Sequence, residues 1–203
     1  MLKIKNNYIR NFFILNIIPS LNINFLNKLQ DNYTNYNTFI ESGTCEGATI
    51  FSLEPYFNNL FTIFYSKNLY ENTKNKYTGN KINFILGDSS IIFKTLLSSV
   101  KEKSIFFLDG HWSGGLTGRS DKDCPLIEEI TCINNLFVND AIIIIDDHRL
   151  FEKGPNNSNS NEDWSLINDN AIINILKNRI SKLYYLDSEC AKDDRMIIHI
   201  NKL

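Results

Sequence analysis

Short, almost continuous runs of apolar residues recur along this chain, and longer amphipathic stretches separate them. The run AIIII at 141–145 is the clearest, because a strand covered by helices on both faces is hydrophobic at every position. Earlier runs of the same kind end near Gly, Asp or Ser and occupy residues 38–41, 60–65, 82–86 and 104–108. The pattern predicts parallel strands alternating with helices.

The stretches between these runs are long enough for crossover helices, which we predict at 46–57, 69–77, 90–100 and 124–137. After the fifth run, the polar segment GPNNSNSNEDW predicts a mobile loop, followed by a helix over about 164–177. The last runs, KLYYLD and RMIIHI, are spaced for a hairpin. The predicted fold is α/β, with a doubly wound, mostly parallel sheet of about seven strands and a C-terminal antiparallel hairpin.

Nothing resembling a Pro- or Ser-rich linker divides the 203 residues, so one domain is expected. The alternating pattern predicts this domain at 36–203. Residues 1–35 precede the pattern and are predicted to form an N-terminal helical extension or cap, or a subunit contact, which leaves a homo-oligomer open.

Charge and cysteine usage exclude several partners. The net charge is -2 and the basic residues are scattered, which disfavours nucleic acid. Polar residues interrupt the N-terminal apolar stretch and no cleavage site follows it, so we predict a packed helix or strand there, with no membrane partner. The four cysteines contain no CxxC pair, which favours reduced thiols and a cytoplasmic location.

Ligands of open parallel sheets bind beyond the carboxyl ends of the strands, so the residues after each apolar run are the candidates for a site. The first run leads into ESGTCEGAT, whose Gly43 and Gly47 suit a backbone that turns sharply or lies against a ligand. A purely structural tight turn has the same pattern.

Four of the five strand ends carry acids, namely Glu41, Asp88, Asp109 and the pair Asp146 and Asp147. A single Asp at such a position is usually a helix cap or turn former. A row of acids along one sheet edge is different, because crowded carboxylates repel each other unless a cation or a donor-rich ligand is present.

The ordered motifs ESGTxxGxT, GDSS, FLDGHWSGG, KDCPLIEEI and IIIIDDHRLF resemble a group of class I S-adenosylmethionine-dependent methyltransferase-like domains, over about residues 38–153. The resemblance implies a Rossmann-like fold and S-adenosylmethionine as cofactor. It also implies that the cofactor is held by Glu41, Gly43, Thr44 and Gly47, with Asp88 and Ser89 facing its adenine.

The fourth and fifth strand ends are also similar to metal-dependent O-methyltransferases of the macrocin and catechol types. That similarity implies a Mg²⁺ ion held by Asp109, Asp146 and Asp147, which would bind a substrate hydroxyl and lower its pKa. Asp109 and His111 are the predicted catalytic residues. His111 is interpreted as a general base or substrate contact, or alternatively as a residue that orients the glycine-rich loop.

The second strand end departs from the family pattern SIELSxxLY, whose Glu accepts hydrogen bonds from the ribose hydroxyls. This chain has TIFYSKNLY, so Phe64 stands where the Glu is expected. Ribose binding then lacks that acceptor unless Ser66, Asn68 or Glu71 substitutes.

These observations predict an O-methyltransferase acting on a small polar molecule such as a sugar, the sugar by analogy with the macrocin type. The Asp-Pro-Pro-Tyr type motif of amino-methylating nucleic acid enzymes is absent, which disfavours N-methylation of bases. Phe64 motivates an alternative, a catalytically degenerate or repurposed Rossmann-like binding module. A hydroxylase-like or glycan-modifying activity on a similar scaffold is a third alternative.

Overall fold

The computed structural model describes residues 19–114, 117–155 and 163–203. At its centre lies a seven-stranded sheet in the order β3-β2-β1-β4-β5-β7-β6. The five strands predicted first are parallel, and each lies within one residue of its predicted bounds. The strands are β1 (Thr38–Ser42), β2 (Asn59–Phe64), β3 (Ile82–Leu86), β4 (Ser104–Leu108), β5 (Ala141–Ile145), β6 (Ile180–Leu186) and β7 (Arg195–Ile200).

The C-terminal hairpin is confirmed, and β7 runs antiparallel to both of its neighbours, β5 and β6. All six residues of β7 are buried, because this strand enters the sheet between the other two. Ile145 at the end of β5 pairs with Met196 near the start of β7. The first residue of β7, Arg195, therefore lies at the same sheet edge as the residues that follow β5.

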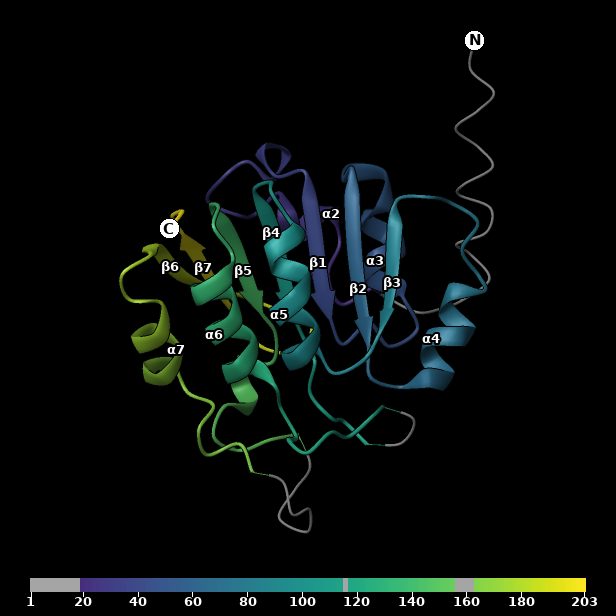
Figure 1. The fold of residues 1–203 in the computed structure, drawn as a ribbon. Coiled ribbons are helices and arrows are strands. Elements are labelled where there is room, and N and C mark those ends of the chain that lie inside the picture. Colours follow the sequence, from purple (N-terminus) through teal and green to yellow (C-terminus); the bar gives the residue numbers. More distant parts are fainter. Residues whose placement is uncertain (1–18, 115–116, 156–162) are drawn as a thin grey trace.

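Helices cover both faces of the sheet, as the doubly wound prediction requires (Figure 1). The described α-helices are α2 (Ile23–Leu26), α3 (Ala48–Leu53), α4 (Lys67–Lys74), α5 (Ser89–Ser99), α6 (Leu126–Leu136) and α7 (Asp169–Leu176). Short 3-10 helices occupy η1 (Tyr33–Asn35), η2 (Glu54–Tyr56) and η3 (His148–Leu150).

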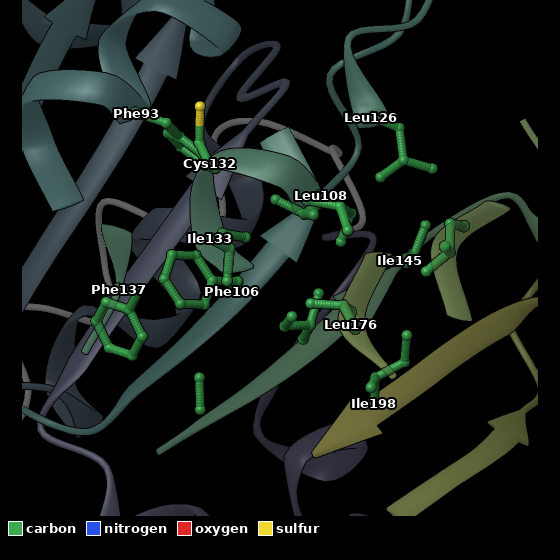
Figure 2. Packing of buried hydrophobic residues seen from close by; sticks show 14 of the residues in the cluster. Phe93, Phe106, Leu108, Leu126, Cys132, Ile133, Phe137, Ile145, Leu176 and Ile198 are labelled. Atoms are coloured by element: carbon green, nitrogen blue, oxygen red, sulfur yellow. The ribbon is translucent and has the colours of Figure 1, made fainter. Parts of the chain in front are cut away.

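Alternate residues of β5 face opposite layers of the core, which explains its unbroken apolar sequence. Ile143 and Ile145 pack into a cluster with α5, α6 and α7, whereas Ile142 and Ile144 pack into a second cluster with α2 and α3. Figure 2 shows part of the first cluster, with Phe106 and Phe137 close together. Their rings meet edge to face, with centroids 5.1 Å apart. Burial of each side chain of this size stabilises the folded state by about 1.5–3 kcal/mol.

Two predicted helices are only about half as long as expected. The helix predicted at 46–57 begins after Gly47, whose φ of 86° is outside the helical region, and Pro55 stands in the 3-10 turn that ends it. The helix predicted from Trp164 begins at Asp169, because Asn168 caps its first turn by accepting from the Ala171 N–H at 2.9 Å.

The predictions for the N-terminus and for the polar loop fall partly on residues 1–18 and 156–162, outside the described residues. Within 19–35, Leu21, Phe25 and Leu26 are buried in the second cluster. In the described parts of the chain, no helix has the length and apolar character that crossing a membrane requires.

Candidate active site

Strands β1–β5 all point toward one edge of the sheet (Figure 1). A cleft of about 560 Å³ lies at this edge. This volume is in the range of small-molecule sites, roughly 300–1,000 Å³. The loops after all five parallel strands line it, together with the segment 188–190 between β6 and β7. Most of the predicted site residues line this cleft, namely Gly43, Thr44, Asp88, Ser89, Asp109, His111, Asp146 and Asp147. Glu41 and Gly47 do not.

The two glycines after β1 are required by contacts within the chain. A Cβ on Gly43 would lie 1.9 Å from the carbonyl oxygen of Asp109, so the loops after β1 and β4 are in backbone contact. A Cβ on Gly47 would lie 2.6 Å from Cγ2 of Thr73 in α4. Both glycines have positive φ, which side chains disfavour. The glycine turn and the acidic loop thus form one continuous wall of the cleft.

Glu41 lies beneath the cleft and supports this wall. Its side chain is buried, and its Oε1 accepts a hydrogen bond from Thr62 Oγ1 at 2.7 Å. Thr62 is in turn hydrogen-bonded to Thr44, which lines the cleft. Burial raises the pKa of Glu41 to about 8, although both threonine hydroxyls act against this shift. Glu41 is therefore protonated at neutral pH, and its part in cofactor binding stays a prediction.

The raised pKa predicts that Glu41 makes the folded state less stable as pH rises. Its ordinary pKa of 4.5 applies to the unfolded chain and about 8 to the folded one, so stability is highest below 4.5 and is lost up to about pH 8. The variant Glu41→Gln carries no titrating group. We expect its free energy of unfolding, relative to the parent chain, to rise by about 3 kcal/mol between about pH 5 and pH 8.

Urea unfolding of both proteins at the two pH values measures this difference. Because other acids titrate equally in both proteins, they cancel in the comparison. A constant difference would mean that Glu41 is ionised in the folded chain.

Asp109, His111 and Asp147 form a compact charged group in the cleft. His111 Nε2 lies 2.7 Å from Asp147 Oδ2 and 3.4 Å from Asp109 Oδ1. Burial lowers the pKa of His111, but the hydrogen bonds and charges of the two carboxylates outweigh it and raise this pKa to about 10. Burial also raises the pKa of Asp109. At neutral pH the group therefore holds one shared proton on or near His111, and it titrates as a unit.

Two arginines that the sequence analysis did not single out neutralise the remaining acids. Arg195 Nε lies 3.0 Å from Asp146 Oδ1, with side-chain exposures of only 2% and 8%. Arg149 Nη1 lies 2.6 Å from Asp147 Oδ1 and also pairs with the fully buried Asp194. The signal for Arg149 was present, since it follows the acidic pair in IDDHR. The position of Arg195 beside Asp146 could be predicted only from the pairing of β7 with β5.

This arrangement does not fit a Mg²⁺ ion held jointly by the three predicted carboxylates. Two groups have ligand atoms within 4.8 Å of one another, Asp109 with His111 and Asp147, and Asp146 with Asp147 and Asp194. Neither group contains all three predicted ligands, and side-chain cations already pair with the carboxylates of each. A shared ion would require these ion pairs to break, so Mg²⁺ binding stays a prediction.

Phe64 lies at the end of β2, in the wall of the cleft. Its ring is 3% exposed, lies nearly parallel to that of Phe84 at 6.2 Å, and meets Tyr70 edge to face at 5.8 Å. Of the three residues considered as substitutes for the ribose-binding acid, Ser66 lines the cleft, whereas Asn68 and Glu71 do not. Phe64 therefore exposes little surface to the cleft, and Ser66 brings a hydroxyl to this end of it.

Asp88 and Ser89 follow β3, next to the Phe64 segment. Asp88 caps α5, since its Oδ1 accepts hydrogen bonds from the backbone N–H of Ser90 at 2.9 Å and from its hydroxyl at 2.6 Å. The predicted adenine-facing residues are thus held by helix capping at the same end of the cleft as Phe64.

No family model matches this chain, and no curated protein matches its sequence. Solved structures do match it. The O-methyltransferase TomG from Streptomyces achromogenes, in complex with S-adenosylmethionine, has a TM-score of 0.58 at 14% identity, covering 84% of this chain and 75% of that chain. The N-methyltransferase NodS from Bradyrhizobium japonicum WM9 has a TM-score of 0.53 at 10% identity, covering 82% and 86%. The PH0226 protein from Pyrococcus horikoshii OT3 has a TM-score of 0.54 at 11% identity, covering 88% and 85%.

The chain therefore has the Rossmann-like fold of S-adenosylmethionine-dependent methyltransferases, as the sequence predicted. At such low identity the likeness shows the fold alone. Since the matches include both an O- and an N-methyltransferase, they do not decide which atom is methylated. The similarity to macrocin- and catechol-type enzymes stays a prediction.

Proposed function

We propose that this chain is an S-adenosylmethionine-dependent methyltransferase that methylates a hydroxyl of a small polar molecule, such as a sugar. One observation carries the proposal. A single cleft at the carboxyl edge of the sheet joins the glycine turn after β1 to the Asp109–His111–Asp147 group. In open α/β sheets this edge is where ligands bind.

The cleft offers suitable surfaces for both ends of the cofactor. Gly43 and Thr44 line the cleft at the centre of the sheet, where the methionine portion is expected. Tyr65, Ser66 and Ser89 follow β2 and β3, where an adenine would meet an exposed aromatic ring and hydroxyls. When bound, S-adenosylmethionine supplies an electrophilic methyl group on its sulfonium.

Deprotonation of the substrate hydroxyl is assigned to Asp109 and His111 acting as a pair. Both line the cleft, with His111 Nε2 3.4 Å from Asp109 Oδ1. Because His111 is already protonated at neutral pH, the carboxylate of Asp109, whose pKa burial raises, accepts the proton, and the charge of His111 stabilises the group. The remainder of the catalysis is positioning, because the attacking oxygen, methyl carbon and sulfur must lie in line. Lys122, Asp123 and Arg149 add charged groups to the cleft, which suit a hydroxyl-rich substrate.

Calorimetric titration with S-adenosylmethionine and S-adenosylhomocysteine tests the proposal. We expect saturable binding of both. Methyl transfer from S-adenosylmethionine to a panel of sugars would identify the acceptor. Ser66→Trp, which fills the cleft beside Phe64, should weaken S-adenosylhomocysteine binding at least about tenfold, or 1.4 kcal/mol. Asn68→Trp, in the helix that Ser66 caps but outside the cleft, is the matched control and should bind within about twofold of the parent.

Absence of binding at millimolar cofactor, with and without Mg²⁺, would favour the second candidate, a repurposed Rossmann-like binding module. Phe64 is the observation behind that candidate, since a buried ring stands where the ribose-binding acid is expected. Equal affinity in the two tryptophan variants would mean that the cofactor binds elsewhere.

Chelation is expected to leave the transfer rate unchanged. The three predicted metal ligands are paired with His111, Arg149 and Arg195, so none of these three carboxylates requires a metal ion to balance its charge. Methyl transfer measured in EDTA and in millimolar Mg²⁺ checks this. Loss of transfer in EDTA and its recovery with Mg²⁺ would restore the metal-dependent interpretation.

A further inference from the structure

A second, much smaller cavity lies beside the cleft, under the loop that follows β4. Its volume is about 10 Å³, and its walls come from that loop, the start of α6, the end of β5 and Trp164. It shares Asp109, Gly110 and His111 with the cleft. By the same measure one water molecule needs about 10–15 Å³. The cavity is therefore of the size that holds a single water.

Three polar atoms without a hydrogen-bond partner in the described part of the chain belong to residues that line this cavity. They are His111 Nδ1, Glu129 Oε1 and Trp164 Nε1. The side chains of Glu129 and Trp164 are buried, with exposures of 1% and 4%. Buried polar groups are nearly always satisfied by protein or by ordered water, so three such atoms around one cavity call for a shared partner.

The orientations of these side chains agree with a shared partner. Nε2 of His111 faces Asp109 and Asp147, so Nδ1, on the other side of the ring, is turned away from these acids. The ring centroids of His111 and Trp164 are 5.3 Å apart, and the two ring planes lie at 66° to each other. A Cβ on Gly110 would lie 3.2 Å from Glu129 Oε1, so this carboxyl lies directly under the loop that carries His111.

We infer that one buried water molecule joins His111, Trp164 and Glu129, and that Glu129 is a positioning residue for His111. The water accepts hydrogen bonds from His111 Nδ1–H and Trp164 Nε1–H, and it donates one to Glu129 Oε1. Two N–H donors and one carboxyl acceptor match what a water can satisfy. The N–H donors oppose a cation at this place, and the carboxyl opposes an anion.

Burial raises the pKa of Glu129, and the neighbouring hydroxyls of Ser89 and Ser42 lower it, with a net result of about 7. Within the described ranges, Ser42 Oγ, like Glu129 Oε1, has no hydrogen-bond partner. This gives a role to the KDCPLIEEI motif, in which Glu129 is the second glutamate.

The water fixes which nitrogen of His111 faces the cleft. With the hydrogen of Nδ1 held toward Glu129, Nε2 is the nitrogen directed at the carboxylates and at the site of transfer. The consequence for catalysis rests on the proposed methyltransferase function. The water and the orientation of the imidazole do not, and they can be measured in the cofactor-free chain.

A high-resolution crystal structure of the full chain tests the water directly. We expect a water within hydrogen-bond distance of all three atoms, about 2.7–3.2 Å. A cavity without water, or a water that lacks the contact to His111 or Glu129, would overturn the inference.

Nitrogen NMR of the chain labelled at histidine tests the positioning. At neutral pH His111 should carry a hydrogen on both nitrogens. The Nδ1–H signal should be protected from exchange with solvent in the parent and in Glu129→Gln, which keeps an acceptor oxygen, but not in Glu129→Leu, which lacks one. If Glu129→Leu does not fold, Trp164→Phe removes one donor and should shift the Nδ1 resonance alone. An Nδ1 without a hydrogen in the parent at neutral pH, or an Nδ1 resonance that no variant shifts, would refute the positioning role.

In the methyl-transfer assay, Glu129→Leu should lower kcat at least about tenfold, a part of the roughly 10²–10⁴-fold that acid–base catalysis supplies. Its affinity for S-adenosylhomocysteine should stay within about twofold, and Glu129→Gln should restore most of the rate. A kcat unaffected by Glu129→Leu would overturn the catalytic consequence. If the parent binds no cofactor, the proposed function fails while the crystal and NMR results still decide the inference.

Discussion

Arg195→Met is expected to destabilise the folded chain by about 3–5 kcal/mol, the cost of leaving one member of a buried ion pair without its partner. Arg195 is 2% exposed and pairs with the buried Asp146 at 3.0 Å. It also donates to the carbonyl of Ser20 and lies over the ring of Phe25 at 4.6 Å. The guanidinium thus joins the end of β5, the start of β7 and the segment that precedes β1. Urea unfolding measures the loss.

Two further variants show whether the loss comes from the unpaired buried charge. Lys67→Met breaks the exposed Lys67–Glu71 pair, whose side chains are 76% and 55% exposed, and should cost about 0.5 kcal/mol or less. Adding Asp146→Leu to Arg195→Met removes both buried charges and should recover most of the stability. A loss below about 1 kcal/mol for Arg195→Met would show that Asp146 is neutral or hydrated in the folded chain.

Much of the fold could be predicted because its causes are local. A run such as AIIII is apolar at every position, which suits burial on both faces, and its bounds at 141–145 are those of β5. The helix starts were less predictable. Gly47 and Asn168 end the non-helical segments before α3 and α7, and single capping residues of this kind are hard to distinguish from ordinary loop residues.

The candidate site could be predicted where one topological rule was enough. Parallel strands end at one edge, so Gly43, Asp109 and Asp146 had to lie near each other once β1, β4 and β5 were correct. Arg195 could not be placed, because a hairpin can add either of its strands to β5. In this chain β7 lies between β5 and β6, which puts Arg195 opposite the end of β5. That pairing also places Arg195 beside Asp146, so the cleft is less acidic than its strand ends alone predict.

The second large effect is expected for His111→Gln, which should lower kcat for methyl transfer by about 10²–10⁴-fold. Glutamine keeps a hydrogen-bond donor for Asp109 and Asp147 but cannot carry an exchangeable positive charge. In the parent chain these two carboxylates hold the pKa of His111 at about 10, against the effect of its burial. The variant therefore removes the shared proton while leaving the glycine turn of the cleft in place.

The affinity for S-adenosylhomocysteine separates catalysis from binding in this experiment. It should change by less than about threefold in His111→Gln, because the loss concerns transfer of the methyl group and not cofactor binding. His148→Gln is the matched control, since His148 also contacts a carboxylate, Asp169 at 2.9 Å, but does not line the cleft. If both variants retain the parental kcat, the proton of the substrate hydroxyl leaves by another route, and His111 serves only to hold the loop after β4 against the acids of β5.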